Sequence, residues 1–139
     1  MYKLLSIEED YMFTRYVELK NCETGKVEQC FDDSDVRNDE QKDFWFMQIG
    51  GIYECKILLF GRAFDLSETM EENCILCKAI GQELTVGRLK IIPVVNNENL
   101  YYVATKDIKN IKDVSRFAFD FSRKDLIQVD EIIAPKLLR

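Results

Sequence analysis

Residues 44–61, FWFMQIGGIYECKILLFG, form the most apolar stretch of this chain and contain its only tryptophan. The Gly50-Gly51 pair divides the stretch into an aromatic cluster and a strand that follows it. The strand is predicted over residues 52–60, because its apolar side chains alternate. One face would carry Tyr53, Cys55, Ile57 and Leu59. We expect this strand to lie at the centre of a small β-domain.

Short apolar runs bounded by turn residues predict further strands around it. These runs are residues 2–7, 11–21, 27–31, 84–95 and 100–105. The turn at Glu23-Thr24-Gly25 predicts a first hairpin, in which Val17 would face Phe31. The last two runs predict a second hairpin, with Gly87 as a bulge.

The C-terminal part of the chain carries two competing patterns. Residues 106–121 show both helical spacing and strand-like alternation, so periodicity does not assign them. Ser122 and Asp125 have the spacing of a capping box, which predicts a helix over residues 122–134. The expected fold is therefore mainly β. It would be a single domain, with a small, antiparallel, partly open barrel (residues 1–105) and a helical appendage packed on it (residues 106–139).

This order of elements resembles the OB-fold, at the level of the fold and over residues 1–105. The resemblance rests on a long acidic first hairpin, a Gly-x-Tyr-x-Cys-x-Ile strand at residues 51–57 and a closing hairpin. OB-folds bind single-stranded nucleic acid on aromatic side chains in a positively charged groove, so the resemblance implies that function as one alternative. Ordinary antiparallel α+β packing is the rival architecture.

Composition excludes several classes of function. The chain of 139 residues has no histidine, which removes Ser-His and Cys-His nucleophile pairs and every metal site that needs an imidazole. Its net charge of −6 disfavours nucleic acid and anionic membranes as partners. No signal peptide or membrane span is apparent, so we expect a cytoplasmic protein with reduced cysteines. We expect no cofactor and no enzymatic activity, and the oligomeric state is left open.

The formal motif Cys74-Ile75-Leu76-Cys77 is the one sign of thiol or metal chemistry. A redox site would need the motif at a helix N-terminus, and a zinc site would need two further ligands. Two bulky aliphatic residues separate the thiols, which is typical of a core segment. We favour buried structural thiols, with a zinc or redox protein as an alternative. The acidic run at Asp33 lacks the glycine and the final acid of an EF-hand, which favours a solvated loop.

Aromatic residues are the candidate binding determinants, alone or with nearby cations. The candidates are Phe44, Trp45, Phe46, Tyr53, Tyr101 and Tyr102, with Arg62 and Arg88 as possible cationic neighbours. Core packing explains clustered aromatics equally well in a small β-domain. From the acidic charge and the absence of histidine, we expect a non-enzymatic binding module with a protein partner. Binding of single-stranded nucleic acid through the aromatics is the alternative.

Overall fold

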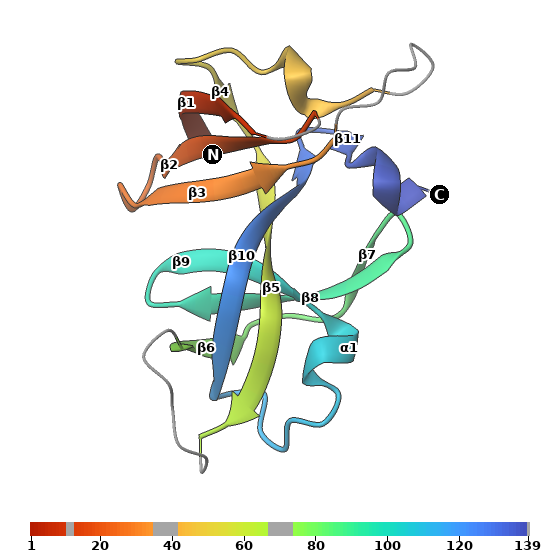
Figure 1. Cartoon of the computed structure of the whole chain (residues 1–139). Coiled ribbons are helices and arrows are strands. Elements are labelled where there is room, and N and C mark those ends of the chain that lie inside the picture. The colour runs from red at the N-terminus through yellow and green to blue at the C-terminus, as the bar shows by residue number, and fades with distance from the viewer. Residues whose placement is uncertain (11–12, 35–41, 67–73, 139) are drawn as a thin grey trace.

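The computed structural model describes residues 1–10, 13–34, 42–66 and 74–138. These residues form a mainly β protein, as expected, with eleven strands in one mixed sheet (Figure 1). The strands are β1 (Tyr2–Glu9), β2 (Arg15–Asn21), β3 (Val27–Asp32), β4 (Ile52–Tyr53), β5 (Cys55–Asp65), β6 (Cys74–Ala79), β7 (Leu84–Val86), β8 (Leu89–Asn96), β9 (Asn99–Ala104), β10 (Phe117–Val129) and β11 (Ile132–Ile133). The helical turns are η1 (Phe44–Phe46), α1 (Thr105–Ile108) and η2 (Pro135–Leu138). None of the described helices is long and apolar enough to cross a membrane.

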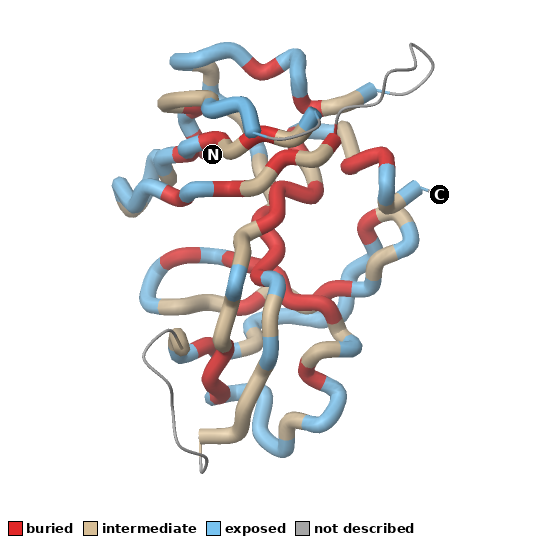
Figure 2. Tube along the Cα trace, viewed as in Figure 1, coloured by how far each residue is buried: buried red, intermediate tan, exposed pale blue. Residues whose placement is uncertain are grey.

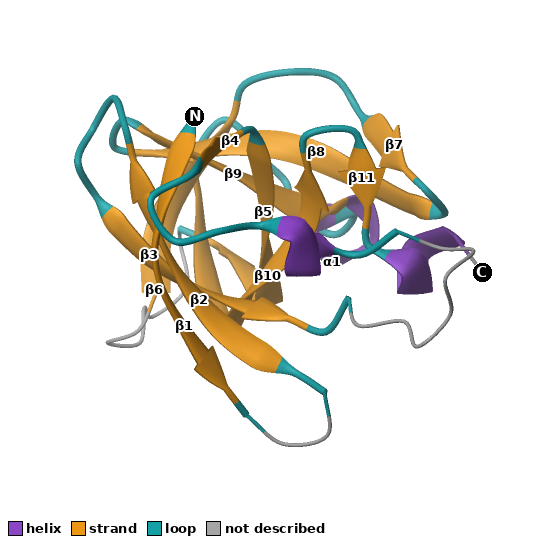
Figure 3. Cartoon of the chain, turned by 90° about the horizontal axis from the view of Figure 1, so that it is seen from above, coloured by secondary structure: helices purple, strands orange, loops and turns teal. Residues whose placement is uncertain are grey.

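Five strands close a circuit of pairings. Strand β10 pairs with β5 and β6, β6 pairs with β8, β8 with β9, and β9 with β5. Seen from above, the sheet curls into a ring (Figure 3). Most pairings are antiparallel, as predicted, but β5–β9 and β3–β10 are parallel. The sheet is therefore mixed.

The strands β4-β1-β2-β3 continue the sheet beyond this circuit. In the sheet they join it at one parallel pair of residues, Phe31 of β3 and Asp125 of β10. Figure 1 shows these strands above the circuit, with β5 and β10 running through both parts. The first hairpin, on which the OB-fold resemblance partly rests, thus lies outside the five-stranded circuit.

The predicted register of the first hairpin is wrong by one residue. Val17 lies opposite Cys30 rather than Phe31. The turn is set by Asn21, whose side-chain oxygen accepts hydrogen bonds from two backbone N–H groups of the loop. A slip of one residue moves every side chain of a strand to the other face. Glu28 consequently points into the protein and Val27 points out.

The helix predicted over residues 122–134 is wrong, and no helical appendage forms there. This region lies in the long strand β10, in a turn and in β11. Ser122 sits at a bulge of β10, where its hydroxyl donates to the carbonyl of Phe60 instead of capping a helix. A capping pattern is worth about 1 kcal/mol. It is outweighed here because β10 pairs with β5 along most of its length and also contacts β3, β6 and β11.

The sequence also predicts a bend or bulge at Gly61, after the central strand. This prediction and the one for Gly87 have different outcomes. Gly61 does mark a bulge, although the extra residue lies in the partner strand at Ser122. A Cβ on Gly61 would collide with the carbonyl oxygen of Asp120, so this close approach of β5 and β10 requires glycine. Gly87 is not a bulge. It begins the tight turn between β7 and β8, with a φ of 59°. The sequence also predicts a short helix within residues 66–72, capped by Ser67. Residues 67–73 lie outside the described part of the chain.

The main core fills the ring and extends beneath the first hairpin. Figure 2 shows its buried positions gathered where β5 and β10 cross the centre of the molecule. A smaller apolar cluster lies on the other face, and it consists of Leu58, Val86, Ile91, Tyr102 and Ile127. Leu58 and Phe60 interrupt the alternation of the central strand, which predicts that both are buried. Leu58 is buried, as are its neighbours Ile57 and Leu59, but Phe60 is 50% exposed, so that part of the prediction is wrong.

Candidate functional site: an apolar groove beside Phe46

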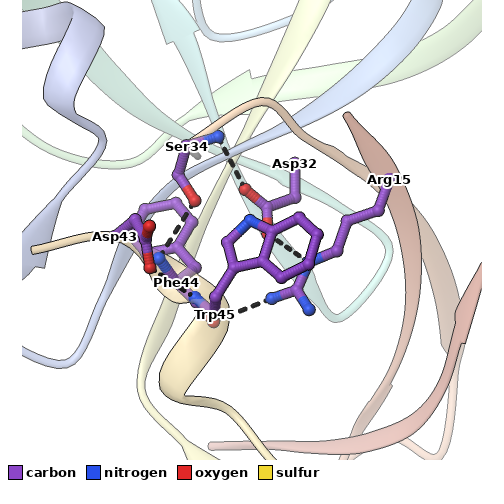
Figure 4. A network of polar contacts seen from close by, with 6 residues as sticks. All are labelled: Arg15, Asp32, Ser34, Asp43, Phe44 and Trp45. Atoms are coloured by element: carbon purple, nitrogen blue, oxygen red, sulfur yellow. Dashed lines mark hydrogen bonds and ion pairs between the residues drawn. The ribbon is translucent and has the colours of Figure 1, made fainter. Parts of the chain in front are cut away.

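A buried polar network fixes the chain just before the aromatic cluster (Figure 4). The Nε of Arg15 donates to Oδ2 of Asp32 at 2.7 Å, and its Nη2 donates to the carbonyl of Phe44 at 2.8 Å. The other oxygen of Asp32 accepts from the N–H of Ser34, whose hydroxyl accepts from the N–H of Phe44. All four residues are buried. The network therefore ties β2, the end of β3 and η1 into one rigid unit.

The helical turn η1 sorts its aromatic residues into inner and outer positions. A 3-10 helix has three residues per turn, so residues three apart share a side. Phe44 and Met47 accordingly face the core, whereas Trp45 and Phe46 are 36% and 44% exposed. The Asp43 side chain caps this turn by accepting from the N–H of Trp45.

Both exposed aromatic rings are held in place by neighbours. The guanidinium of Arg15 lies 4.4 Å from the centre of the Trp45 ring, a cation–π contact. The Phe46 ring meets Tyr53 edge to face at 5.7 Å, and the Tyr53 hydroxyl accepts a hydrogen bond from the N–H of Gln48. Exposed aromatic surface on a pre-ordered segment loses little entropy when it binds a partner.

Phe46 forms one wall of a groove of about 620 Å³. The groove is also lined by Lys42, Asp130, Glu131, Ile132, Ile133 and Leu138. The opposite wall is the turn from β10 to β11, where Asp130 adopts a left-handed conformation with a φ of 51°. Glu54 anchors this turn, because its N–H donates to the Asp130 carboxylate and its carbonyl accepts from the Asp130 N–H.

The groove combines an apolar floor with an acidic rim. Phe46, Ile132, Ile133 and Leu138 supply apolar surface, and Leu138 is half exposed. Asp130 and Glu131 line the groove, and Glu54 is bonded to Asp130 beside it. Lys42 is the single cation among the described lining residues. The local charge therefore matches the net charge of the whole chain in sign.

The remaining predicted binding residues do not join this groove. Tyr101 is fully buried inside the ring, and burial together with the nearby Glu28 carboxylate raises the pKa of its hydroxyl. Tyr102 belongs to the apolar cluster on the other face. Arg62 lies over the ring of Phe64 on β5, and Arg88 sits in the turn after β7. Of the predicted set, Phe46 alone lines the groove. Tyr53 contacts the Phe46 ring, and Phe44 and Trp45 lie in the same helical turn.

The CxxC motif lies on a strand rather than at a helix N-terminus. Cys74 and Cys77 are the first and last residues of β6 that pair with β10. Residues three apart on a strand point to opposite faces, so the two side chains diverge. Within the described ranges no three potential ligands among Cys, His, Asp and Glu lie close enough to hold a metal ion. The five cysteines are unpaired.

Burial predicts a clear order of thiol reactivity. Burial raises the pKa of Cys77 to about 12 and, with Asp130, that of Cys55 to about 12. At about pH 8 such a thiol is deprotonated in roughly one molecule in ten thousand, and only the deprotonated form, the thiolate, reacts. We expect iodoacetamide to modify the exposed Cys22 rapidly and to leave Cys30 and Cys77 intact, as measured by peptide mass spectrometry. All five should react in urea, whereas fast labelling of Cys77 in buffer would mean that β6 detaches readily.

Sequence reasoning missed the groove for one identifiable reason. Its second wall lies in the region that was assigned to a helix, so Ile132 and Ile133 seemed to belong to a packed helical face. The available signal was Asp130-Glu131 between Val129 and the apolar pair Ile132-Ile133, because aspartate is among the residues that tolerate the left-handed conformation of a tight turn. The burial of Asp32 and Ser34 was also missed, since an acidic run is normally solvated.

In the comparisons with known proteins, no family model matches this chain, and no curated protein or solved structure matches it either.

Proposed function

We propose that this chain is a non-enzymatic protein-interaction module. Its binding site would be the groove beside Phe46, and its ligand a partner segment that carries an apolar side chain flanked by Lys or Arg. The single observation that carries the proposal is the exposure of Phe46 and Trp45 on a segment held by buried hydrogen bonds. Aromatic anchors of this kind contribute most to the affinity of protein interfaces.

The charge of the groove supports the basic character of the partner. Asp130 and Glu131 line the groove, and the chain as a whole carries a charge of −6. Opposite charges at the rim of an interface steer association and select the partner more than they add affinity. A nucleic acid is disfavoured at the same place, because its phosphates would meet these carboxylates.

The ring of strands supports an OB-like architecture for the module, because the OB-fold is a five-stranded, partly open barrel. The OB-fold alternative function, stacking of bases on aromatic side chains, would need exposed rings. Tyr101 and Tyr102 are buried, so the set of aromatics that the sequence suggested is not assembled on one surface. This favours a protein partner over single-stranded nucleic acid.

Selection of peptides from a random library displayed on phage tests the proposal. We expect the immobilised chain to enrich peptides that combine an apolar or aromatic residue with neighbouring basic residues. Synthetic versions should change the emission of Trp45, the only tryptophan, on binding. Phe46→Ala should weaken this binding by roughly tenfold or more, because truncation of an aromatic anchor costs about 2 kcal/mol.

Two variants serve as controls for this experiment. Phe60→Ala removes an equally exposed aromatic ring outside the groove and should leave the affinity unchanged. Glu131→Gln should weaken binding at low salt and reduce its salt dependence. The proposal is wrong if no peptide is enriched, or if the selected peptides bind Phe46→Ala as tightly as the unmodified chain.

A further inference from the structure

A second cleft, of about 350 Å³, lies on the outer face of the sheet. Its lining comes from β5, β8, β9, β10, α1 and η2. Figure 1 shows α1 at the lower right of β5 and β10, two of the strands that line the cleft. None of the groove residues beside Phe46 lines it. The two sites are therefore separate, and the inference below does not depend on the proposed protein partner.

The floor of the cleft is apolar, because the cleft lies against the small outer cluster. The hairpin of β7 and β8 covers part of this cluster, and η2 adds Leu137 to it. Five aliphatic residues line the cleft, namely Leu58, Leu89, Ala104, Ile127 and Leu137. Leu89 and Leu137 are half-buried, and the other three are buried.

One wall of the cleft is a pre-ordered stack of flat groups. The Arg123 guanidinium lies 4.9 Å from the centre of the Phe60 ring and 4.6 Å from that of Phe31. Two hydrogen bonds to the Asp125 carboxylate, at 2.5 and 3.1 Å, hold the guanidinium in this orientation. Phe60 is half exposed and lines the cleft, so a planar or aliphatic group in the cleft could lie against it.

The charges around the cleft differ in whether they are already paired. Arg123 is paired with Asp125, and Lys136 donates to Asp33 at 2.9 Å. Lys106 also lines the cleft and forms no ion pair with any other described residue. Its neighbour Asp107 has a pKa raised by burial, which Lys106 partly offsets. Lys106 is thus the cation that can receive an anion without breaking an existing pair.

We infer that this cleft binds a small organic anion with an apolar body. The apolar body would lie on the floor and against Phe60, and the acidic group, a carboxylate or a phosphate ester, would pair with Lys106. Arg123 and Lys136 also line the cleft, but each is paired with a carboxylate, so Lys106 is the cation that carries the proposal. The volume is at the lower end of the range for small-molecule sites, about 300–1,000 Å³, which favours a small molecule over a peptide.

Titration of the full chain, followed by amide chemical shifts in NMR spectra, tests this inference with defined probes. Phenylacetate and phenyl phosphate supply both parts of the ligand, with either acid. Phenylethanol lacks the charge, and acetate and inorganic phosphate lack the apolar body. We expect saturable shifts at residues 58–61, 104–107 and 123–127 with the two complete probes. The incomplete probes should bind at least tenfold more weakly, and the stronger of the two complete probes identifies the preferred acid.

Variants of two lysines complete the test. Lys106→Gln should weaken binding of the complete probes by roughly tenfold, because a charge-assisted hydrogen bond is lost. Lys90→Gln removes an exposed lysine of β8 that does not line the cleft and should have no effect. Phe46→Ala should also leave this binding unchanged, which separates the two sites. The inference is overturned if no probe saturates at millimolar concentration, if phenylethanol binds equally well, or if Lys106→Gln binds like the unmodified chain.

Discussion

Replacement of Asp32 by asparagine is expected to lower the free energy of unfolding by about 3–5 kcal/mol. The Asp32 side chain is fully buried, and it accepts hydrogen bonds from Arg15 and from the N–H of Ser34. Without its negative charge, the Arg15 guanidinium would remain buried and uncompensated. The cost of such an orphaned charge dominates the effect, since the net value of an intact buried ion pair is much smaller.

Asp33 provides a matched control at the next position. It is also ion-paired, with Lys136, but its side chain is 27% exposed. Asp33→Asn should therefore cost less than about 1 kcal/mol, as for other surface ion pairs. Urea unfolding followed by circular dichroism measures the free energy of unfolding of both variants. It does not rely on the fluorescence of Trp45, whose environment changes in Asp32→Asn. Equal effects of the two substitutions would show that the Arg15 network does not stabilise the fold.

The same experiment connects stability to the proposed site. Arg15 bonds to the carbonyl of Phe44 and stacks on Trp45, so loss of Asp32 should also loosen η1. At a urea concentration where Asp32→Asn is still folded, peptides selected on the groove should bind it more weakly. Asp33→Asn should bind them normally. A folded Asp32→Asn variant with full peptide affinity would contradict the role assigned to the network.

Lys124→Met is expected to destabilise the protein by about 3 kcal/mol or more. Lys124 lies 2.6 Å from the Glu28 carboxylate, whose side chain is 1% exposed and faces the core. Methionine preserves the apolar stem of the lysine but leaves Glu28 charged and buried without its partner. The Tyr101 hydroxyl, which lacks a well-aligned hydrogen-bond partner, lies near the same carboxylate and does not replace the lost cation.

Two further variants sharpen this prediction. Lys26 approaches the same Tyr101 ring, at 5.7 Å, but is exposed and has no ion pair among the described residues, so Lys26→Met should change stability by less than about 0.5 kcal/mol. A double variant with Glu28→Gln as well should recover much of the stability lost in Lys124→Met, because the orphaned charge is then removed. Additive losses in the double variant would mean that the pair contributes through packing alone.

The C-terminal region shows where sequence patterns mislead. Ser122 and Asp125 form a correct helix-start pattern, yet both lie in β10. The capping pattern stabilises a helix by only about 1 kcal/mol. The strand is stabilised more, because β10 pairs with β5 along most of its length and with β6 or β3 on its other edge. These partners lie far away in the chain, and no local window contains them. The alternation of Phe117, Phe119 and Phe121 was the valid signal.

The sequence by itself determined the mainly β class, the approximate positions of both hairpins and the split of residues 44–61 at Gly50-Gly51. It also located the central strand, although the predicted residues 52–60 divide at Glu54 into β4 and β5, and β5 continues to Asp65. These features depend on side-chain alternation and turn residues, which act over a few positions. Only the tertiary structure decided which side chains are buried in the hairpins, because a one-residue shift of register exchanges the two faces. It also decided that Phe44 is anchored while Phe46 is exposed, since Arg15, Asp32 and Ser34 come from other elements. The apolar stretch that defines the fold thus supplies both a core strand and, through contacts distant in sequence, one wall of a groove.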